Sequence, residues 1–234
     1  MSDGRRALVL AIETATSAGS VALVSNERTI AGRYFDTGRY HSQRLFTEVE
    51  AMFEGVDERI ADVDGVAVSV GPGSFTGLRI GLSAAKGFCL AAGAALLTVP
   101  TLAGMAARVL YARAPVCPML DARRGQVYTA LYATDQGQPQ PLSDVRIVEA
   151  HQVIEERGGE TTVYLGDVGA LMANDEIETE ALVAPLHCLR PDAGAVGWLG
   201  VGKYFAGDEA DLASAEPEYI RPPYVDEATA GAKG

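Results

Sequence analysis

Residues 66–92 read VAVSVGPGSFTGLRIGLSAAKGFCLAA and contain two different patterns. Residues 66–70 are a short β-branched run typical of a buried strand, and residues 76–92 are long enough for a helix. The glycines between them predict a tight strand-to-helix turn. A strand that passes directly into a helix is characteristic of an α/β fold, which sets the expected fold class.

The turn is also a candidate binding element. It directs backbone N–H groups and the positive end of a helix toward one spot, which suits a phosphate or a carboxylate. A helix cap with tight packing explains the same residues equally well. The pattern matches neither a Walker-type loop nor a dinucleotide fingerprint. The candidate anion or nucleotide contacts are Gly71, Gly73, Ser74, Thr76 and Gly77.

The predicted helix is rich in small residues. A glycine inside a helix costs about 1 kcal/mol relative to alanine, so a compensating interaction is expected. Close approach of another backbone is the physical candidate. The small residues are Gly77, Gly81, Ala84, Ala85, Gly87, Ala91 and Ala92.

The pattern around this stretch occurs twice along the chain. Strands are expected at residues 7–13, 20–24, 29–35, 116–122, 127–133, 145–148, 162–165 and 181–185. Helices are expected at residues 42–53, 101–111, 151–157 and 193–205. The order of β-meander, helix, strand and helix predicts two similar α/β lobes side by side. We place the N-terminal lobe at 1–104, a smaller second lobe at 105–206 and an acidic tail at 207–234.

Composition narrows the function. The 234 residues are 48% hydrophobic and carry a net charge of −12, which disfavours an autonomous nucleic-acid binder. Residues 1–104 hold 9 basic and 11 acidic side chains, so this nearly neutral half is the better place for a protein interface. Three unpaired cysteines indicate a reducing, cytoplasmic setting. The uncharged run 87–107 contains glycine, proline and threonine, which argues against a membrane span.

Catalytic chemistry has limited support. Glu13 and Asp121 end corresponding strands of the two predicted lobes and could face one cleft, holding Mg²⁺-nucleotide or acting as acid and base. They could equally be turn caps. The only histidines, His41, His151 and His187, form no metal motif, so no metal site is expected. Ser74 does not lie in a nucleophile elbow.

Seven stretches together resemble the TsaB family, also called YeaZ, over nearly the whole chain. They are IETAT (12–16), SVAL (20–23), HSQRL (41–45), GPGSFTGLRIG (71–81), VPTL (99–102), DARRGQVY (121–128) and PEYIRPPYV (217–225). The resemblance implies the two-lobe fold of actin, Hsp70 and sugar kinases. It also implies a scaffold subunit for synthesis of N6-threonylcarbamoyladenosine at position 37 of tRNA. The implied partners are the catalytic paralogue TsaD and the ATPase TsaE, with tRNA contacted only through the complex.

The resemblance further implies a chain without its own catalytic metal or cofactor, since ATP, ADP and metal would be bound by the partner subunits. Thr101 and Met105 stand where TsaD proteins carry the two histidines of a metal motif, and neither is a good ligand for a hard metal. Glu13 stands where the family usually has aspartate, which weakens nucleotide binding there. Old peptidase labels of the superfamily are not carried over.

The family pairs through its first two helices, which implies an interface on residues 42–53 and 76–92. Its expected residues are His41, Leu45, Val49, Met52, Leu78, Gly81, Leu82 and Ala85. The alternative is that the apolar stripe packs on this chain's own sheet. Without TsaD the same surface would form a homodimer. The rival function is an autonomous nucleotide-dependent phosphotransferase or ATPase of the same fold.

Overall fold

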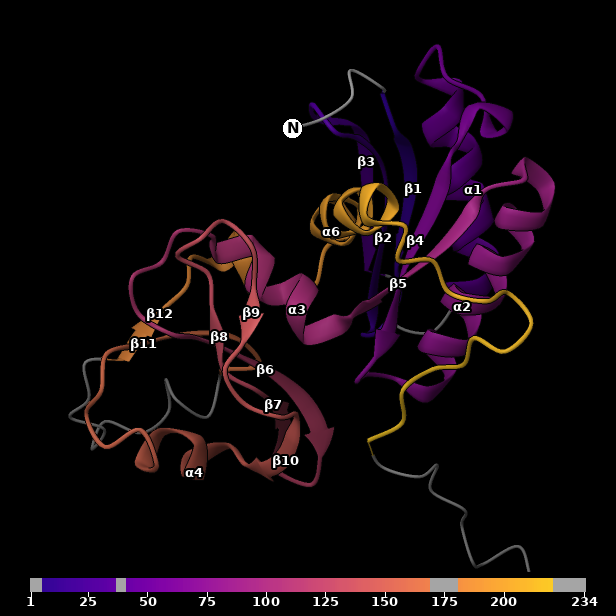
Figure 1. Ribbon diagram of the computed structural model, residues 1–234. Coiled ribbons are helices and arrows are strands. Elements are labelled where there is room, and N and C mark those ends of the chain that lie inside the picture. Colours follow the sequence, from indigo (N-terminus) through magenta and orange to yellow (C-terminus); the bar gives the residue numbers. More distant parts are fainter. Residues whose placement is uncertain (1–5, 37–40, 169–180, 221–234) are drawn as a thin grey trace, which may run out of the picture.

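The computed structural model describes residues 6–36, 41–168 and 181–220, with the side chains of residues 41–43 excepted. Two lobes, each built on one sheet, lie side by side (Figure 1). The first sheet has the order β3-β2-β1-β4-β5, and its strands are β1 (Leu8–Glu13), β2 (Ala18–Ser25), β3 (Thr29–Asp36), β4 (Gly65–Gly71) and β5 (Ala95–Pro100). The second has the order β10-β7-β6-β11-β12, with strands β6 (Val116–Arg123), β7 (Gln126–Thr129), β10 (Arg146–Glu149), β11 (Thr162–Gly166) and β12 (Ala181–Val183).

The two sheets have the same topology. In each, the first strand pairs antiparallel with the second and parallel with the fourth, so β1 corresponds to β6 and β4 to β11. The predicted duplication of a meander followed by parallel strands is confirmed. Two small strands, β8 (Tyr132–Ala133) and β9 (Gln140–Pro141), extend the second sheet beside β6. The single strand predicted at residues 127–133 is thus divided into β7 and β8, and β9 was not predicted.

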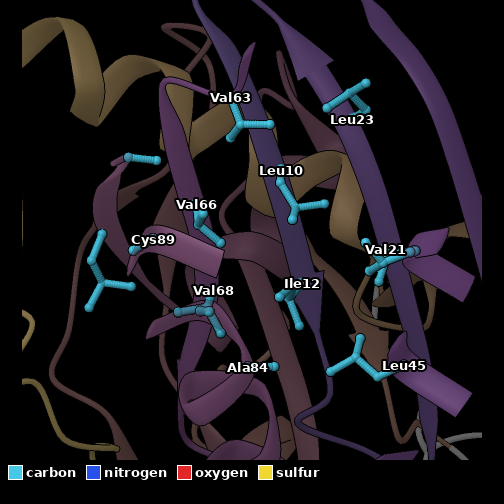
Figure 2. Packing of buried hydrophobic residues seen from close by; sticks show 14 of the residues in the cluster. Leu10, Ile12, Val21, Leu23, Leu45, Val63, Val66, Val68, Ala84 and Cys89 are labelled. Carbon is cyan, nitrogen blue, oxygen red and sulfur yellow. The ribbon is translucent and has the colours of Figure 1, made fainter. Parts of the chain in front are cut away.

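The first sheet is covered on both faces, which explains why its central strands are uninterrupted apolar runs. Leu8, Leu10 and Ile12 of β1 face α1 (His41–Glu54) and α2 (Phe75–Ala92), and Figure 2 shows two of them within that core. Val9 and Ala11 point to the opposite face, against α6 (Ala193–Ala206). Side chains that alternate along one strand therefore contribute to two cores.

Helix α6 corrects the predicted division of the chain. Its residues were assigned to the second lobe, but it packs on β1, β2 and β4 of the first (Figure 1). Gly197 and Gly200 allow this contact, because a Cβ on either would lie 2.6 Å from Val24 or 2.5 Å from Ala67. The first lobe therefore includes a helix that comes from the far end of the chain.

The remaining helices are short. α3 (Thr101–Ala106) ends five residues before the predicted terminus and passes into a 3₁₀ turn at Ala107–Val109. α4 (Ala150–Glu155) covers the second sheet, and two further 3₁₀ turns occur at Ile60–Asp62 and Leu186–Cys188. Within the described residues, no helix combines the length and apolar character needed to cross a membrane. The uncharged run 87–107 resolves into the end of α2, strand β5 and α3.

Candidate functional site

A large cavity lies between the two lobes and has a volume of about 1120 Å³. The first lobe contributes the turn after β1 and the start of α2, and the second contributes the ends of β6 and β11 with the β6–β7 turn. Residues of the C-terminal segment complete it. The lining includes Thr16, Ser17, Gly73, Ser74, Phe75, Thr76, Gly77, Asp121, Arg123, Arg124, Tyr128, Asp167, Arg190, Glu218 and Tyr219.

The glycines of the strand-to-helix turn are explained by contacts within the chain. A Cβ on Gly73 would lie 2.6 Å from the carbonyl oxygen of Ala15, and a Cβ on Gly77 would overlap the carbonyl oxygen of Thr14. A Cβ on Gly81 would lie 2.3 Å from the hydroxyl oxygen of Thr14. Among the small residues of the helix, the predicted close approach of another backbone is therefore found at Gly77, whereas the neighbour of Gly81 is the side chain of Thr14.

Ser74 caps α2. Its hydroxyl accepts a hydrogen bond from the Gly77 N–H at 3.3 Å, and its own N–H donates to the carbonyl of Ala15 at 2.7 Å. These bonds satisfy two donors of the turn with groups of this chain. Ser74 and Thr76 remain exposed on the cleft wall. The predicted anion or nucleotide contact at residues 71–77 therefore stays a prediction, now limited to these two side chains and the adjacent backbone.

Glu13 is turned into the protein. It is 1% exposed, its Oε1 accepts from the Ala15 N–H at 2.6 Å, and its Oε2 accepts from the Ser69 hydroxyl. Burial raises its pKa to about 7, against which the hydrogen bonds from Ser69 and Ala15 act. The expectation that Glu13 and Asp121 face one cleft is wrong, because Glu13 is enclosed by its own turn and by β4.

Asp121, by contrast, lies on the cleft wall with an exposed side chain. Its N–H donates to Asp167 Oδ2 at 2.8 Å, and its Oδ1 accepts from the Arg123 N–H at 2.8 Å. Arg123 and Arg124 adopt φ values of 68° and 58°, a region that costs side chains other than glycine about 1 kcal/mol or more. This tight turn projects from the second lobe at the edge of the cleft.

Thr101 and Met105, the residues at the positions of the paralogue's histidines, are both fully buried. Met105 belongs to the second lobe's hydrophobic core, and the Thr101 hydroxyl makes no hydrogen bond. Neither side chain lines the cleft. Among the described residues, no three His, Cys, Asp or Glu side chains are grouped closely enough to hold a metal ion.

The predicted interface residues lie mostly inside this chain. Seven are buried in the first lobe, namely Leu45, Val49, Met52, Leu78, Gly81, Leu82 and Ala85. The side chain of His41 lies outside the described part of the structure. Buried side chains cannot contact a partner directly, whereas the outer faces of the same helices carry exposed apolar side chains. Phe46 is 54% exposed and Leu90 76%, and the Phe46 and Phe88 rings lie 5.6 Å apart.

Sequence reasoning missed this outer face because it followed the strongest apolar periodicity, which marks the side that packs on the sheet. Phe46 and Leu90 lie off that stripe, and Phe88 lies at its margin, partly buried against the core. Large apolar residues on the polar side of an amphipathic helix are the pattern that could have identified Phe46 and Leu90. We call Phe46, Phe88, Leu90 and the neighbouring Ser83 and Gly87 the outer α1–α2 face.

Three comparisons place the chain among known proteins. The model of the TsaD family, described as tRNA N6-adenosine threonylcarbamoyltransferase, matches residues 36–156. The tRNA threonylcarbamoyladenosine biosynthesis protein TsaB of Escherichia coli is 34% identical over 91% of this chain and 94% of its own. The structure of YeaZ from Pseudomonas aeruginosa superimposes with a TM-score of 0.79 at 27% identity, covering 92% of this chain and all of that one.

The duplicated sheets and the cleft between them define a two-lobe protein of the actin and Hsp70 class. An ADPNP-bound activator of 2-hydroxyisocaproyl-CoA dehydratase from Clostridium difficile shares that fold with a TM-score of 0.54 at 10% identity, covering 86% of this chain and 97% of that one. Within the class, the chain belongs to the TsaB (YeaZ) family.

Proposed function

We propose that this chain is the scaffold and activating subunit of the complex that makes N6-threonylcarbamoyladenosine in tRNA. The catalytic step would belong to a TsaD-type partner, with TsaE as a further subunit. Support comes from the Escherichia coli relative, whose name assigns it to tRNA threonylcarbamoyladenosine biosynthesis. At the positions of the two metal-motif histidines of TsaD proteins this chain has Thr101 and Met105, which are buried and are poor ligands for a hard metal. This is consistent with a non-catalytic role.

The outer α1–α2 face is the observation that carries the proposal. It presents the Phe46 ring and Leu90 to solvent, with the partly buried Phe88 ring between Phe46 and the core, whereas the opposite sides of both helices are buried. Gly87 has no atom within 4 Å of the place where a Cβ would be, so a partner backbone can approach closely there. Exposed apolar groups beside small residues are suited to packing against helices of another subunit. In isolation the same face would support a homodimer.

Charge supports an indirect role toward tRNA. The chain carries a net charge of −12, so its average field opposes binding to a phosphate backbone. The first lobe is nearly neutral, which removes long-range repulsion from the face proposed to meet the partner. The partner would then supply the phosphate contacts, and nucleotide and metal would be bound by the partner subunits.

Mixing the purified chain with its cognate TsaD-type protein tests the proposal. We expect a complex that elutes ahead of both components in size-exclusion chromatography and whose tRNA modification requires both chains. Leu90→Arg should abolish the complex. Leu182→Arg is the matched control, because Leu182 is an exposed leucine on the second lobe and 52% accessible. No complex with the unmodified chain, with or without nucleotide, would refute the proposal.

The rival function, an autonomous nucleotide-dependent phosphotransferase, is favoured by the size of the cleft. The buried Glu13 counts against it, because only Asp121 of the two carboxylates reaches the cleft. Isothermal titration of the isolated chain with Mg-ATP distinguishes the two functions. Tight binding with turnover in the absence of a partner would favour the rival.

A further inference from the structure

The C-terminal segment returns to the cleft after α6. Figure 1 shows it passing beside β5 and α2 on its way. The Ala210 N–H donates to the carbonyl of Leu96 in β5 at 2.8 Å, and Leu212 and Ala215 pack on the core beneath α1 and α2. These contacts anchor the segment before it reaches the space between the lobes.

At the cleft the segment adds to the end of β4. The Glu218 N–H donates to the carbonyl of Val70 at 2.7 Å. The Glu218 carbonyl oxygen occupies the place that a Cβ on Gly71 would take, and Gly71 has a φ of 137°. Glycine is therefore needed at position 71 for two reasons. Other residues rarely adopt this positive φ, and a Cβ would block the close approach of the tail.

Tyr219 then packs against the first turn of α2. Its ring centroid lies 4.9 Å from that of Phe75, and its hydroxyl accepts a hydrogen bond from Arg79 Nε at 3.0 Å. The Arg79 guanidinium lies 4.1 Å from the Phe75 ring centroid. The three side chains form one cluster held by ring stacking, a cation–π contact and a hydrogen bond.

The segment also reaches the second lobe. Glu218, Tyr219 and Ile220 line the cleft together with Leu120, Asp121 and Tyr128. Burial raises the pKa of Tyr132, in β8, to about 12, and the negative charge of Glu218 contributes to the rise. The tail is therefore hydrogen bonded to the first lobe and borders the cleft opposite the second lobe, close enough for the charge of Glu218 to act on Tyr132.

We propose that residues 216–220 form an intramolecular clasp that covers one side of the cleft and holds the two lobes at the angle seen in this structure. The clasp lies directly over residues 71–75, where a ligand in the cleft would meet the strand-to-helix turn. Within the described residues, one backbone hydrogen bond and one aromatic cluster hold its end, so it can open without disrupting either sheet. Its closed and open states would set how accessible the cleft is.

Hydrogen exchange of the full chain tests the docking. We expect the Glu218 amide to exchange at least tenfold more slowly than an unstructured amide, and Tyr219→Ala to remove that protection while speeding exchange of cleft amides at residues 71–79. Tyr219→Phe should give an intermediate effect, because it keeps the ring and loses the bond from Arg79. Phe205→Ala is the control, since Phe205 is an exposed aromatic on α6 that lies outside the clasp.

Spin labels on the two lobes test the second part of the clasp proposal. Cysteines introduced at Glu54 and Glu155, both exposed and one on each lobe, report the distance between α1 and α4. We expect a narrow distance distribution that Tyr219→Ala broadens or shifts and Phe205→Ala leaves unchanged. An unprotected Glu218 amide in the unmodified chain, or distributions that Tyr219→Ala does not change, would overturn the clasp. Both measurements use the isolated chain, so their failure would leave the proposed pairing with TsaD untouched.

Discussion

The Thr14 hydroxyl donates a hydrogen bond of 2.8 Å to the carbonyl of Gly77, and the two backbones are in direct contact there. Strand β1 and helix α2 are thereby joined beside the cleft, with Thr14 itself fully buried. The glycine in the helix is required by this contact. Its cost in helix propensity is offset by the hydrogen bond and the packing that it allows.

Gly77→Ala is therefore expected to lower the free energy of unfolding by about 1 to 3 kcal/mol, because the added Cβ would overlap the Thr14 carbonyl oxygen. Gly87→Ala is the matched substitution, ten residues along the same helix with open space at its Cβ position. It should raise the stability of the isolated chain by up to about 1 kcal/mol through helix propensity. Urea denaturation of both variants measures the difference, and equal effects would contradict the assigned role of Gly77.

Glu13 should make stability depend on pH. Its pKa is raised from the ordinary 4.5 of a glutamate to about 7 in the folded chain, so between these two pH values the folded state holds a proton that unfolding releases. The free energy of unfolding should therefore fall as pH rises from about 4.5 to about 7, by up to about 3 kcal/mol from this group. Glu13→Gln stays neutral and should gain stability relative to the unmodified chain over that interval. A difference between the two that is independent of pH would contradict the buried, protonated Glu13.

The two sides of α2 should respond differently to the same substitution. Leu82→Arg places a charge in the core, where Leu82 is 4% exposed, and is expected to prevent folding. Leu90→Arg changes a side chain that is 76% exposed and should leave the circular dichroism spectrum and the thermal midpoint nearly unchanged. If the Leu90→Arg chain were unfolded, this side of α2 would be packed within the fold of the chain and not available to a partner.

Much of the fold could be predicted because short-range residue patterns in the sequence indicate the individual strands and helices. The β-branched runs, the glycine turn before α2 and the repeated order of elements predicted most strands of both sheets to within a few residues, but not the short strand β9. The placement of α6 could not be predicted in the same way, since a helix sequence does not reveal which sheet it covers. Gly197 and Gly200 are explained only once Val24 and Ala67 are seen beside them.

The site was less predictable than the fold. Glu13 ends a strand at the expected position, but its direction depends on Ser69 and on the turn that follows it. The apolar stripe of α1 and α2 was found correctly, yet burial within the lobe takes it out of reach of a partner. Whether a side chain is exposed depends on its tertiary neighbours. On these helices Phe46 and Leu90 are exposed and available to a partner, whereas Leu45 and Leu82 are buried.

The most direct test of the central claim is the affinity of this chain for its cognate TsaD-type protein, measured by isothermal titration with the unmodified chain, Leu90→Arg and Leu182→Arg. We expect binding by the unmodified chain and by Leu182→Arg, and a loss of at least a hundredfold for Leu90→Arg. Equal affinity of all three would place the interface elsewhere on the chain. No binding by the unmodified chain would contradict the scaffold role itself.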